Sequence, residues 1–150
     1  MGESSPVDEV LEFAIDREIE AHQLYIDLAA RTQNPVMRKV FEDFAKEELG
    51  HKAKLEAMKK GKTVASAPVA PDLKIADYVV GVEPTPNMDY KDVLILAMKK
   101  EKASFRLYTD LAAEVKNEAQ SKTFLSLAQE EARHKLRFEI EYDNVVLKEN

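Results

Sequence analysis

Four segments of this sequence carry ionisable residues in the middle of an apolar stripe. Apolar residues at alternating spacings of three and four mark one face of a helix. In the second segment that face reads Phe41, Phe44, Glu48, His51, Leu55 and Met58. At the corresponding point, the other three stripes carry Glu18, Glu101, and Glu131 with His134. Because burying an unpaired charge costs much free energy, these residues point to a site and not to an ordinary core.

The chemistry that suits this set is metal binding. Each Glu-x-x-His pair presents both side chains on one helix face, since residues three apart are neighbours. Four carboxylates and two imidazoles that face one another must either take up protons or bind cations. A four-helix bundle with this pattern holds two metal ions, and oxygen and nitrogen ligands without sulfur favour iron or manganese. The predicted metal ligands are Glu18, Glu48, His51, Glu101, Glu131 and His134.

The helices that must position these residues form two copies of one hairpin. With a shift of 83 residues, AIDREIEAHQLYIDLAA (14–30) aligns with AMKKEKASFRLYTDLAA (97–113), and FEDFAKEELGHK (41–52) with FLSLAQEEARHK (124–135). Between 10–56 and 93–139, 19 of 47 aligned positions are identical, where chance gives roughly one in fifteen. Such self-similarity indicates a repeated structural unit.

Capping signals predict helices over about 6–31, 35–60, 89–115 and 117–147. Asn34 before Pro35, Asp89 and Asn117 are suitable N-cap residues. Connections of about three residues within each copy force antiparallel neighbours. The segment 61–87 is long enough to run back along helices of ~39 Å. We therefore predict one all-α domain over 1–150, a ferritin-like four-helix bundle with hairpins at about 6–60 and 88–147 and a long crossover at about 61–87.

Composition narrows the function classes. The net charge of −6 gives no general affinity for nucleic acid or anionic membranes. The absence of cysteine excludes thiolate metal sites, iron–sulfur clusters and disulfides within this sequence. No apolar run approaches the ~18 residues that span a bilayer, and the first residues lack an apolar signal region. We expect a cytoplasmic protein.

Several residues near the predicted ligands have two readings. Tyr25 and Tyr108 lie two helical turns after Glu18 and Glu101. They either pack in the core or also donate a hydrogen bond that orients a ligating carboxylate, and we predict the second role.

Three further ionisable residues lie close to the predicted ligands in the sequence. Glu47 and Glu130 precede the histidines by four residues but fall off the stripe, so we interpret them as flanking ion-pair residues. His22 corresponds to Phe105 in the repeat, which favours a histidine at the edge of the core over a metal ligand.

The sequence resembles the rubrerythrin family of ferritin-like diiron carboxylate proteins. The residues that carry the likeness are Glu18 with Tyr25, Glu48-Leu49-Gly50-His51, Glu101 with Tyr108, and Glu131-Ala132-Arg133-His134. The resemblance implies that Glu48 and Glu131 bridge two irons. It also implies that Glu18 and Glu101 are terminal ligands, and that His51 and His134 each bind one iron.

Two departures from the family pattern affect what the resemblance implies. Rubrerythrins usually carry a cysteine-ligated rubredoxin domain, which this sequence lacks, so electrons would come from an external donor protein such as a rubredoxin. Rubrerythrins also carry an additional glutamate three residues after the third-helix ligand, where this sequence has Ser104. The predicted site is therefore closer to the six-ligand arrangement of bacterioferritin-like proteins.

The leading functional hypothesis is a non-haem diiron oxidoreductase that reacts with peroxide or dioxygen in oxidative-stress defence. Three alternatives stay open: an iron-binding or ferroxidase module, a dimanganese catalase-like protein, and a metal-free interaction bundle. The resemblance also implies a homodimer or a higher homo-oligomer.

Overall fold

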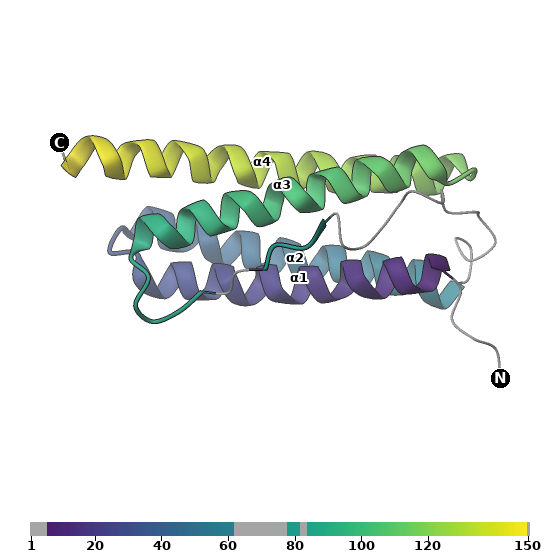
Figure 1. Cartoon of the computed structure of the whole chain (residues 1–150), viewed down its shortest axis with the longest axis horizontal. Helices are drawn as coiled ribbons and strands as arrows, with labels where there is room; N and C mark the ends of the chain where they lie inside the picture. Colours follow the sequence, from purple (N-terminus) through teal and green to yellow (C-terminus); the bar gives the residue numbers. More distant parts are fainter. Residues whose placement is uncertain (1–5, 62–77, 82–83, 150) are drawn as a thin grey trace.

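Four long helices run side by side along the length of the molecule (Figure 1). The computed structural model describes residues 6–61, 78–81 and 84–149. The helices are α1 (Pro6–Arg31), α2 (Pro35–Gly61), α3 (Tyr90–Glu114) and α4 (Glu118–Glu149). These residues contain no strand, and none of their helices has an apolar stretch that could cross a bilayer. The predicted all-α class is confirmed.

Side-chain caps fix three of the helix starts where the sequence indicated them. Asn34, Asp89 and Asn117 each accept a hydrogen bond from a backbone N–H two or three residues later, at 2.9 to 3.0 Å. These bonds satisfy N–H groups that have no partner within the helix. The connections at 32–34 and 115–117 are therefore tight, and each joins two antiparallel helices.

The two hairpins lie against each other in a single bundle. Helix α1 packs against α2, α3 packs against α4, and α1 also contacts α3. Helices α2 and α3 run in the same direction (Figure 1), so α3 begins at the end of the bundle opposite to the end of α2. This is the arrangement expected of a bundle with one long crossover. Most of the predicted crossover, at 62–77 and 82–83, lies outside the described residues.

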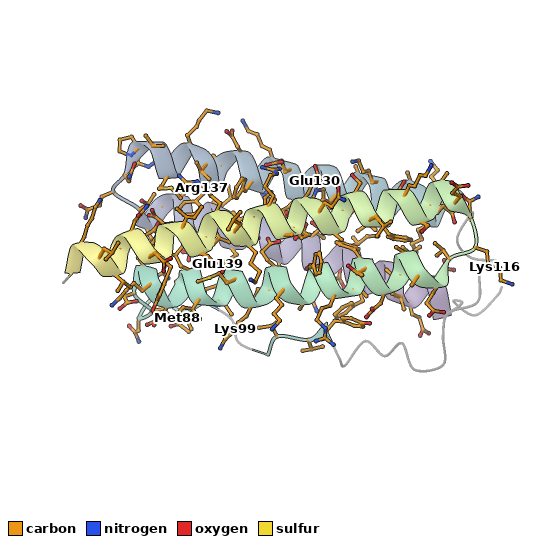
Figure 2. All side chains as sticks on the ribbon, turned by 90° about the horizontal axis from the view of Figure 1, so that it is seen from above. Met88, Lys99, Lys116, Glu130, Arg137 and Glu139 are labelled. Carbon is orange, nitrogen blue, oxygen red and sulfur yellow. The ribbon has the colours of Figure 1, made fainter. Side chains whose placement is uncertain are left out.

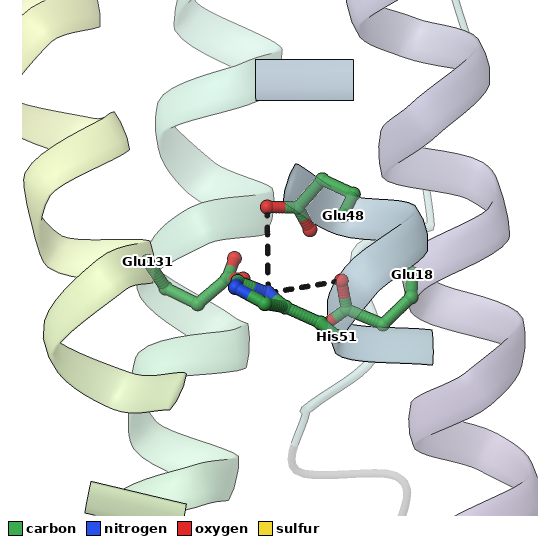
Figure 3. A group of neighbouring side chains, drawn as sticks. All are labelled: Glu18, Glu48, His51 and Glu131. Atoms are coloured by element: carbon green, nitrogen blue, oxygen red, sulfur yellow. Dashed lines mark hydrogen bonds and ion pairs between the residues drawn. The ribbon is translucent and has the colours of Figure 1, made fainter. Parts of the chain in front are cut away.

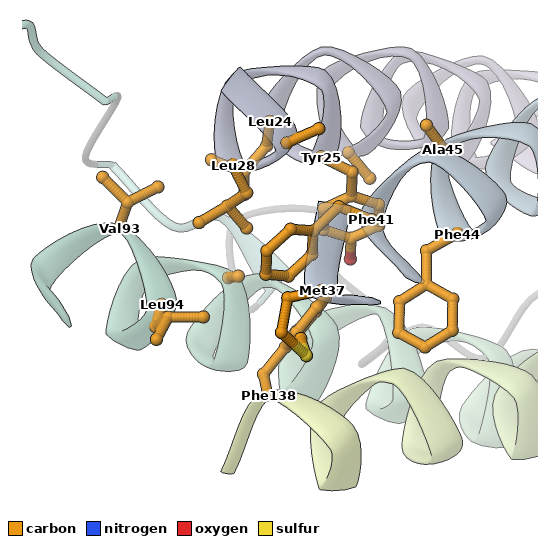
Figure 4. Close-up of a cluster of buried hydrophobic side chains, with 13 residues drawn as sticks. Leu24, Tyr25, Leu28, Met37, Phe41, Phe44, Ala45, Val93, Leu94 and Phe138 are labelled. Atoms are coloured by element: carbon orange, nitrogen blue, oxygen red, sulfur yellow. The ribbon is translucent and has the colours of Figure 1, made fainter. Parts of the chain in front are cut away.

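The core consists of two apolar clusters, one toward each end of the bundle. The first core cluster combines the start of α1 and the end of α2 with the end of α3 and the start of α4; it includes Leu11, Leu55, Leu111 and Phe124. The second core cluster (Figure 4) combines the opposite ends of the helices and includes Leu28, Phe41, Leu94 and Phe138. The stretch between the two clusters is polar, and it holds the predicted site.

Candidate metal centre

Six ionisable side chains from the four helices meet between the two core clusters. Each is at most 2% exposed. They form two overlapping groups, within each of which one ligand atom per residue lies within 4.8 Å of the others. The first group is Glu18, Glu48, His51 and Glu131 (Figure 3). The second group is Glu48, Glu101, Glu131 and His134. All six predicted residues are thus brought together, and Glu48 and Glu131 belong to both groups.

Both histidines direct their Nδ1 atom toward the carboxylates. His51 Nδ1 lies 2.7 Å from Glu131 Oε1 and 3.4 Å from Glu18 Oε2. His134 Nδ1 lies 2.9 Å from Glu48 Oε1. Each imidazole therefore approaches the glutamate that the opposite hairpin contributes to both groups. The site consequently links α2 to α4 as well as binding the helices of each hairpin together.

The Nε2 atom of each histidine points to a glutamate on the neighbouring helix. His51 Nε2 lies 2.8 Å from Glu130 Oε2 and is hydrogen-bonded to it, and Glu130 projects from α4 (Figure 2). His134 Nε2 lies 3.4 Å from Glu47 Oε2, and Glu47 also accepts a hydrogen bond from Arg133. Glu47 and Glu130 form ion pairs, as predicted. The crossed pairing with the histidines was not predicted, although its sequence signal, a glutamate four residues before each histidine, was visible.

The two predicted tyrosines behave differently. The Tyr108 hydroxyl donates a hydrogen bond to Glu18 Oε1 across the interface between α3 and α1, which is the orienting contact that the sequence suggested. The Tyr25 hydroxyl is buried and has no hydrogen-bond partner among the described residues. Its ring instead packs edge-on against the His134 ring, with centroids 6.0 Å apart. Tyr25 therefore contacts the site through its ring.

Burial shifts the ionisation of the carboxyl groups in the metal-free protein. The pKa of Glu48 lies well above its usual value because burial disfavours the charged form, and the charges of Glu131 and Glu18 add to the effect. The pKa of Glu101 is raised for the same reasons, burial first and the charge of Glu131 second. Without a cation, these groups therefore tend to hold protons.

The two imidazoles shift in opposite directions. Burial opposes the charged form of His51, but the hydrogen bonds and charges of Glu131 and Glu18 outweigh burial and raise its pKa to about 10. For His134, burial dominates and lowers the pKa to about 4, although the charge of Glu47 works against it. The charges of Arg133 and His51 add to the effect of burial at His134, whereas Glu131 and Glu18 oppose burial at His51.

The unsatisfied atoms of this layer fit bound cations. Buried polar atoms are nearly always paired in folded proteins. Here several such atoms lack a hydrogen-bond partner within the described chain: Glu18 Oε2, both carboxylate oxygens of Glu48, Glu101 Oε2 and both ring nitrogens of His134. Carboxylate oxygen and imidazole nitrogen are ligands of iron and manganese. The donor set and its unpaired atoms therefore fit a pair of metal ions.

Comparison with known proteins assigns the family. A family model described as Rubrerythrin matches residues 9–142, a range that contains all six residues of the two groups. The chain belongs to the rubrerythrin family. It is also similar to a solved structure, the hypothetical protein Pfu-1136390-001 from Pyrococcus furiosus, with 26% identity and a TM-score of 0.73 over 93% of this chain and 89% of that one. No curated protein sequence matches the chain.

Membership of the rubrerythrin family supports a diiron carboxylate protein and explains the two overlapping groups. Two further residues discussed in the sequence analysis lie close to the site. Ser104, where the resemblance led us to expect an additional glutamate, is half-buried three residues after Glu101 on α3. His22 is turned away from the site, because its Nδ1 donates a hydrogen bond to the Ala45 carbonyl at 3.0 Å. The interpretation of His22 as a core-edge residue agrees with this contact.

Proposed function

We propose that this chain is a non-haem diiron oxidoreductase of rubrerythrin type, which reduces peroxide or dioxygen with electrons from an external donor protein. The observation that carries the proposal is that Glu48 and Glu131 belong to both four-residue groups. Shared carboxylates hold two metal ions next to each other, and a diiron pair stores two electrons for delivery to one oxidant molecule. Manganese fits the same ligands and is the alternative metal.

The chain's own residues would bind, orient and shield the pair. Glu18, Glu101, His51 and His134 would each bind one metal, and Glu48 and Glu131 both. The hydrogen bond from Tyr108 fixes the orientation of Glu18, and Glu130 fixes that of His51. The two core clusters exclude water from the site in both directions along the bundle. These features hold the ligands in place before any metal arrives.

The proposed reaction consumes reducing equivalents that this sequence does not supply. Peroxide reduction takes up two electrons and two protons, breaks the O–O bond and releases two water molecules. These 150 residues contain no cysteine that could hold a rubredoxin-type iron, and the proposed donor is an electron-transfer protein such as a rubredoxin. Oxidative-stress defence in the cytoplasm and assembly into a homodimer or higher homo-oligomer complete the proposal.

The test is a reduction and oxidation cycle of the iron-loaded protein. Native protein should contain two iron atoms per chain, lose its ferric absorbance on anaerobic reduction, and regain it with one equivalent of hydrogen peroxide. The Glu131→Gln variant should lose the cycle, whereas Glu42→Gln, at an exposed position of α2, should keep it. A loaded wild-type protein that stays reduced in the presence of peroxide and dioxygen would refute the proposal.

A ferroxidase is the second candidate, and Ser104 is the observation that favours it, because only six ligand residues then surround the metals. Oxidation of many ferrous ions per chain without any electron donor would support this alternative. Elemental analysis of protein from its natural host distinguishes these two iron proteins, the oxidoreductase and the ferroxidase, from a dimanganese protein and from a metal-free bundle.

A further inference from the structure

An apolar stripe runs along the side of α4 that faces away from the bundle. At spacings of three and four residues, which share one helix face, it comprises Leu125, Gln129, Ala132, Leu136, Ile140, Asp143 and Leu147. Its leucine and isoleucine side chains are between 44% and 71% exposed. Helix α4 forms one edge of the bundle (Figure 1) and lies in front of the other described helices in Figure 2, so none of them covers this face.

The first copy of the repeat lacks such a stripe. The corresponding positions of α2, 83 residues earlier, carry Glu42, Lys46, Leu49, Ala53, Ala57 and Lys60. The outward face of a bundle helix is ordinarily polar, so α2 follows the usual pattern and α4 departs from it. Both helices carry the same Glu-x-x-His pattern on their inner face, so the metal centre does not account for the difference. A contiguous exposed apolar surface marks an interaction site.

The stripe is nearly symmetrical about Leu136. Four, seven and 11 residues away on either side of it lie the pairs Ala132 and Ile140, Gln129 and Asp143, and Leu125 and Leu147. In a twofold interface, each residue of one copy meets the residue that meets it in the other. A second, antiparallel α4 related by a twofold axis at Leu136 would therefore bring the two members of each pair together.

The side chains of these pairs complement each other. Leucine meets leucine at both ends of the stripe and at its centre. The small side chain of Ala132 leaves room for Ile140, and the Gln129 amide is a hydrogen-bond donor for the Asp143 carboxylate. Leu136 also lies near the middle of α4, which runs from Glu118 to Glu149. Two copies would consequently overlap over most of the helix, roughly 40 Å at 1.5 Å per residue.

Charged residues beside the stripe fit the same arrangement. Lys135 Nζ lies 2.8 Å from Glu139 Oε1 on the same helix. A twofold axis at Leu136 brings this edge of one copy alongside the same edge of the other. Lys135 of one copy would then lie within about 3 Å, measured along the axis, of the level of Glu139 in the other. Opposite charges that face each other across a helix pair favour that partner and that orientation.

We propose that the outward face of α4 is a self-association surface, through which two copies of this chain pair their α4 helices antiparallel about Leu136. The inference rests on the proposed function only for the expectation of a homo-oligomer, and it does not depend on the diiron reaction. It assigns the stripe to a second copy of this chain, because the stripe is complementary to itself.

The first test uses the absence of cysteine from the sequence. Helices packed about 8–10 Å apart bring facing Cα atoms to about 5 Å, which suits a disulfide. Leu136→Cys should therefore give a disulfide-linked dimer on mild oxidation, because position 136 meets itself on the twofold axis. Ala53→Cys, the matched change at the exposed counterpart on α2, should give at least about 10-fold less linked dimer.

The second test measures association directly by analytical ultracentrifugation. Leu136→Glu places two like charges on the twofold axis and should raise the dissociation constant of the dimer by at least about 100-fold. The control Ala53→Glu should change it less than about 2-fold. If circular dichroism shows that Leu136→Glu fails to fold, Leu125→Glu tests the end of the same stripe and should also weaken the dimer.

Wild-type protein that stays monomeric overturns the proposal, and so does a dimer that persists in the folded glutamate variants. A monomer that binds lipid vesicles or a different protein through this stripe would overturn it as well. The peroxide cycle of the iron-loaded wild type is measured separately, so these results leave the proposed diiron function intact. Conversely, a dimer that forms as expected but shows no such cycle would overturn the proposed function alone.

Discussion

His51 and His134 occupy equivalent positions of the repeat, but their outer nitrogens meet different surroundings. Glu130 lies 2.8 Å from His51 Nε2, whereas Glu47 lies 3.4 Å from His134 Nε2. We attribute this difference to Arg133, which binds Glu47. The residue equivalent to Arg133 in the first copy is Gly50, which has no side chain to compete for Glu130. One substitution within the repeat therefore loosens the support of one histidine.

The two tyrosines beside the six buried residues also differ in their hydrogen-bond partners. Tyr108 binds Glu18 of the first group, while its counterpart Tyr25 has no partner within the described residues. The repeat thus places the six predicted ligands in two similar groups, and the residues around them make the two groups unequal. We expect the first group to bind its metal more tightly than the second, because its ligands are held by more contacts.

The largest effect should come from the residues that the two groups share. Glu131→Gln removes a ligand atom from both groups and should lower the affinity for both metals by more than about 100-fold, beyond what loss of an outer partner costs. Glu18→Gln should weaken the binding of only one metal, because Glu18 belongs to the first group alone. Competition with a chelator, followed by elemental analysis, measures both variants. Loss of a single metal in Glu131→Gln would show that the groups do not overlap as described.

Substitution of Glu130 and Glu47, which contact the Nε2 atoms of the two histidines, tests directly whether the two groups differ in metal affinity. Glu130→Gln should weaken metal binding at the first group by about 10- to 100-fold, because a carboxylate that orients a ligating histidine has an effect of this size. Glu47→Gln should weaken the second group by less, since Glu47 is farther from its histidine and is already engaged by Arg133. Anaerobic cobalt titrations, which resolve two sites by absorbance, compare the variants. Equal losses would contradict the comparison.

The two tyrosines offer a matched pair in the metal-free protein. Tyr108→Phe deletes a hydrogen bond to a buried carboxylate and should lower the free energy of unfolding by about 2 kcal/mol. Tyr25→Phe deletes a hydroxyl that has no partner and should change it by less than about 0.5 kcal/mol. Urea denaturation followed by circular dichroism, in the presence of a chelator, gives both values. Similar losses in the two variants would indicate that Tyr25 has a partner.

The opposite pKa shifts of the histidines predict how the stability of the metal-free protein depends on pH. The raised pKa of His51, about 10, gives a stabilisation that is complete below pH 6.5 and is lost as the pH rises toward 10. The lowered pKa of His134, about 4, gives one that is present above pH 6.5 and is lost as the pH falls toward 4. The raised pKa values of Glu48 and Glu101 stabilise the folded protein at low pH, and this stabilisation is lost as the pH rises above the ordinary carboxyl pKa of 4.5.

Above pH 6.5 the contributions of His51, Glu48 and Glu101 fall while that of His134 stays constant. Below pH 6.5 the loss from His134 is opposed by the contribution of the two carboxyl groups. Stability should therefore drop more from pH 6.5 to 9 than from pH 6.5 to 5, by on the order of 2 kcal/mol. Denaturation in urea at these three pH values, with a chelator, measures the drop, and bound metal should abolish it. A steeper loss on the acidic side would show that the shifts have the wrong sign.

The helices and the meeting of the six buried residues could be predicted from the sequence. Contacts that depend on how two helices face each other could not. The caps Asn34, Asp89 and Asn117 act within three residues of themselves, so local sequence determines them. The prediction of the six buried residues rests on helical periodicity and the repeat. The crossed contact of Glu130 with His51 depends instead on how α2 and α4 face each other.

The smallest effect on metal affinity should come from exchanging Arg133 and Gly50, the equivalent residues to which we attribute the unequal support of the two histidines. Arg133→Ala leaves Glu47 free to approach His134 and should strengthen metal binding at the second group by roughly 3-fold, a fraction of what an outer partner contributes. Gly50→Arg introduces a competitor for Glu130 and should weaken the first group by a similar factor. The side chain has room, because a Cβ at Gly50 meets no atom within 4 Å.

Gly50→Ala is the control for this exchange, since it adds the same helix-forming tendency, about 1 kcal/mol, without the charge. The double variant, Gly50→Arg with Arg133→Ala, should reverse the order in which the two groups fill in the cobalt titration. An order that survives the exchange would mean that the inequality arises from the tyrosines and not from Arg133. Because Tyr108 supports Glu18 of the first group in every variant, Tyr108→Phe in the same background should increase the difference in affinity between the two groups further.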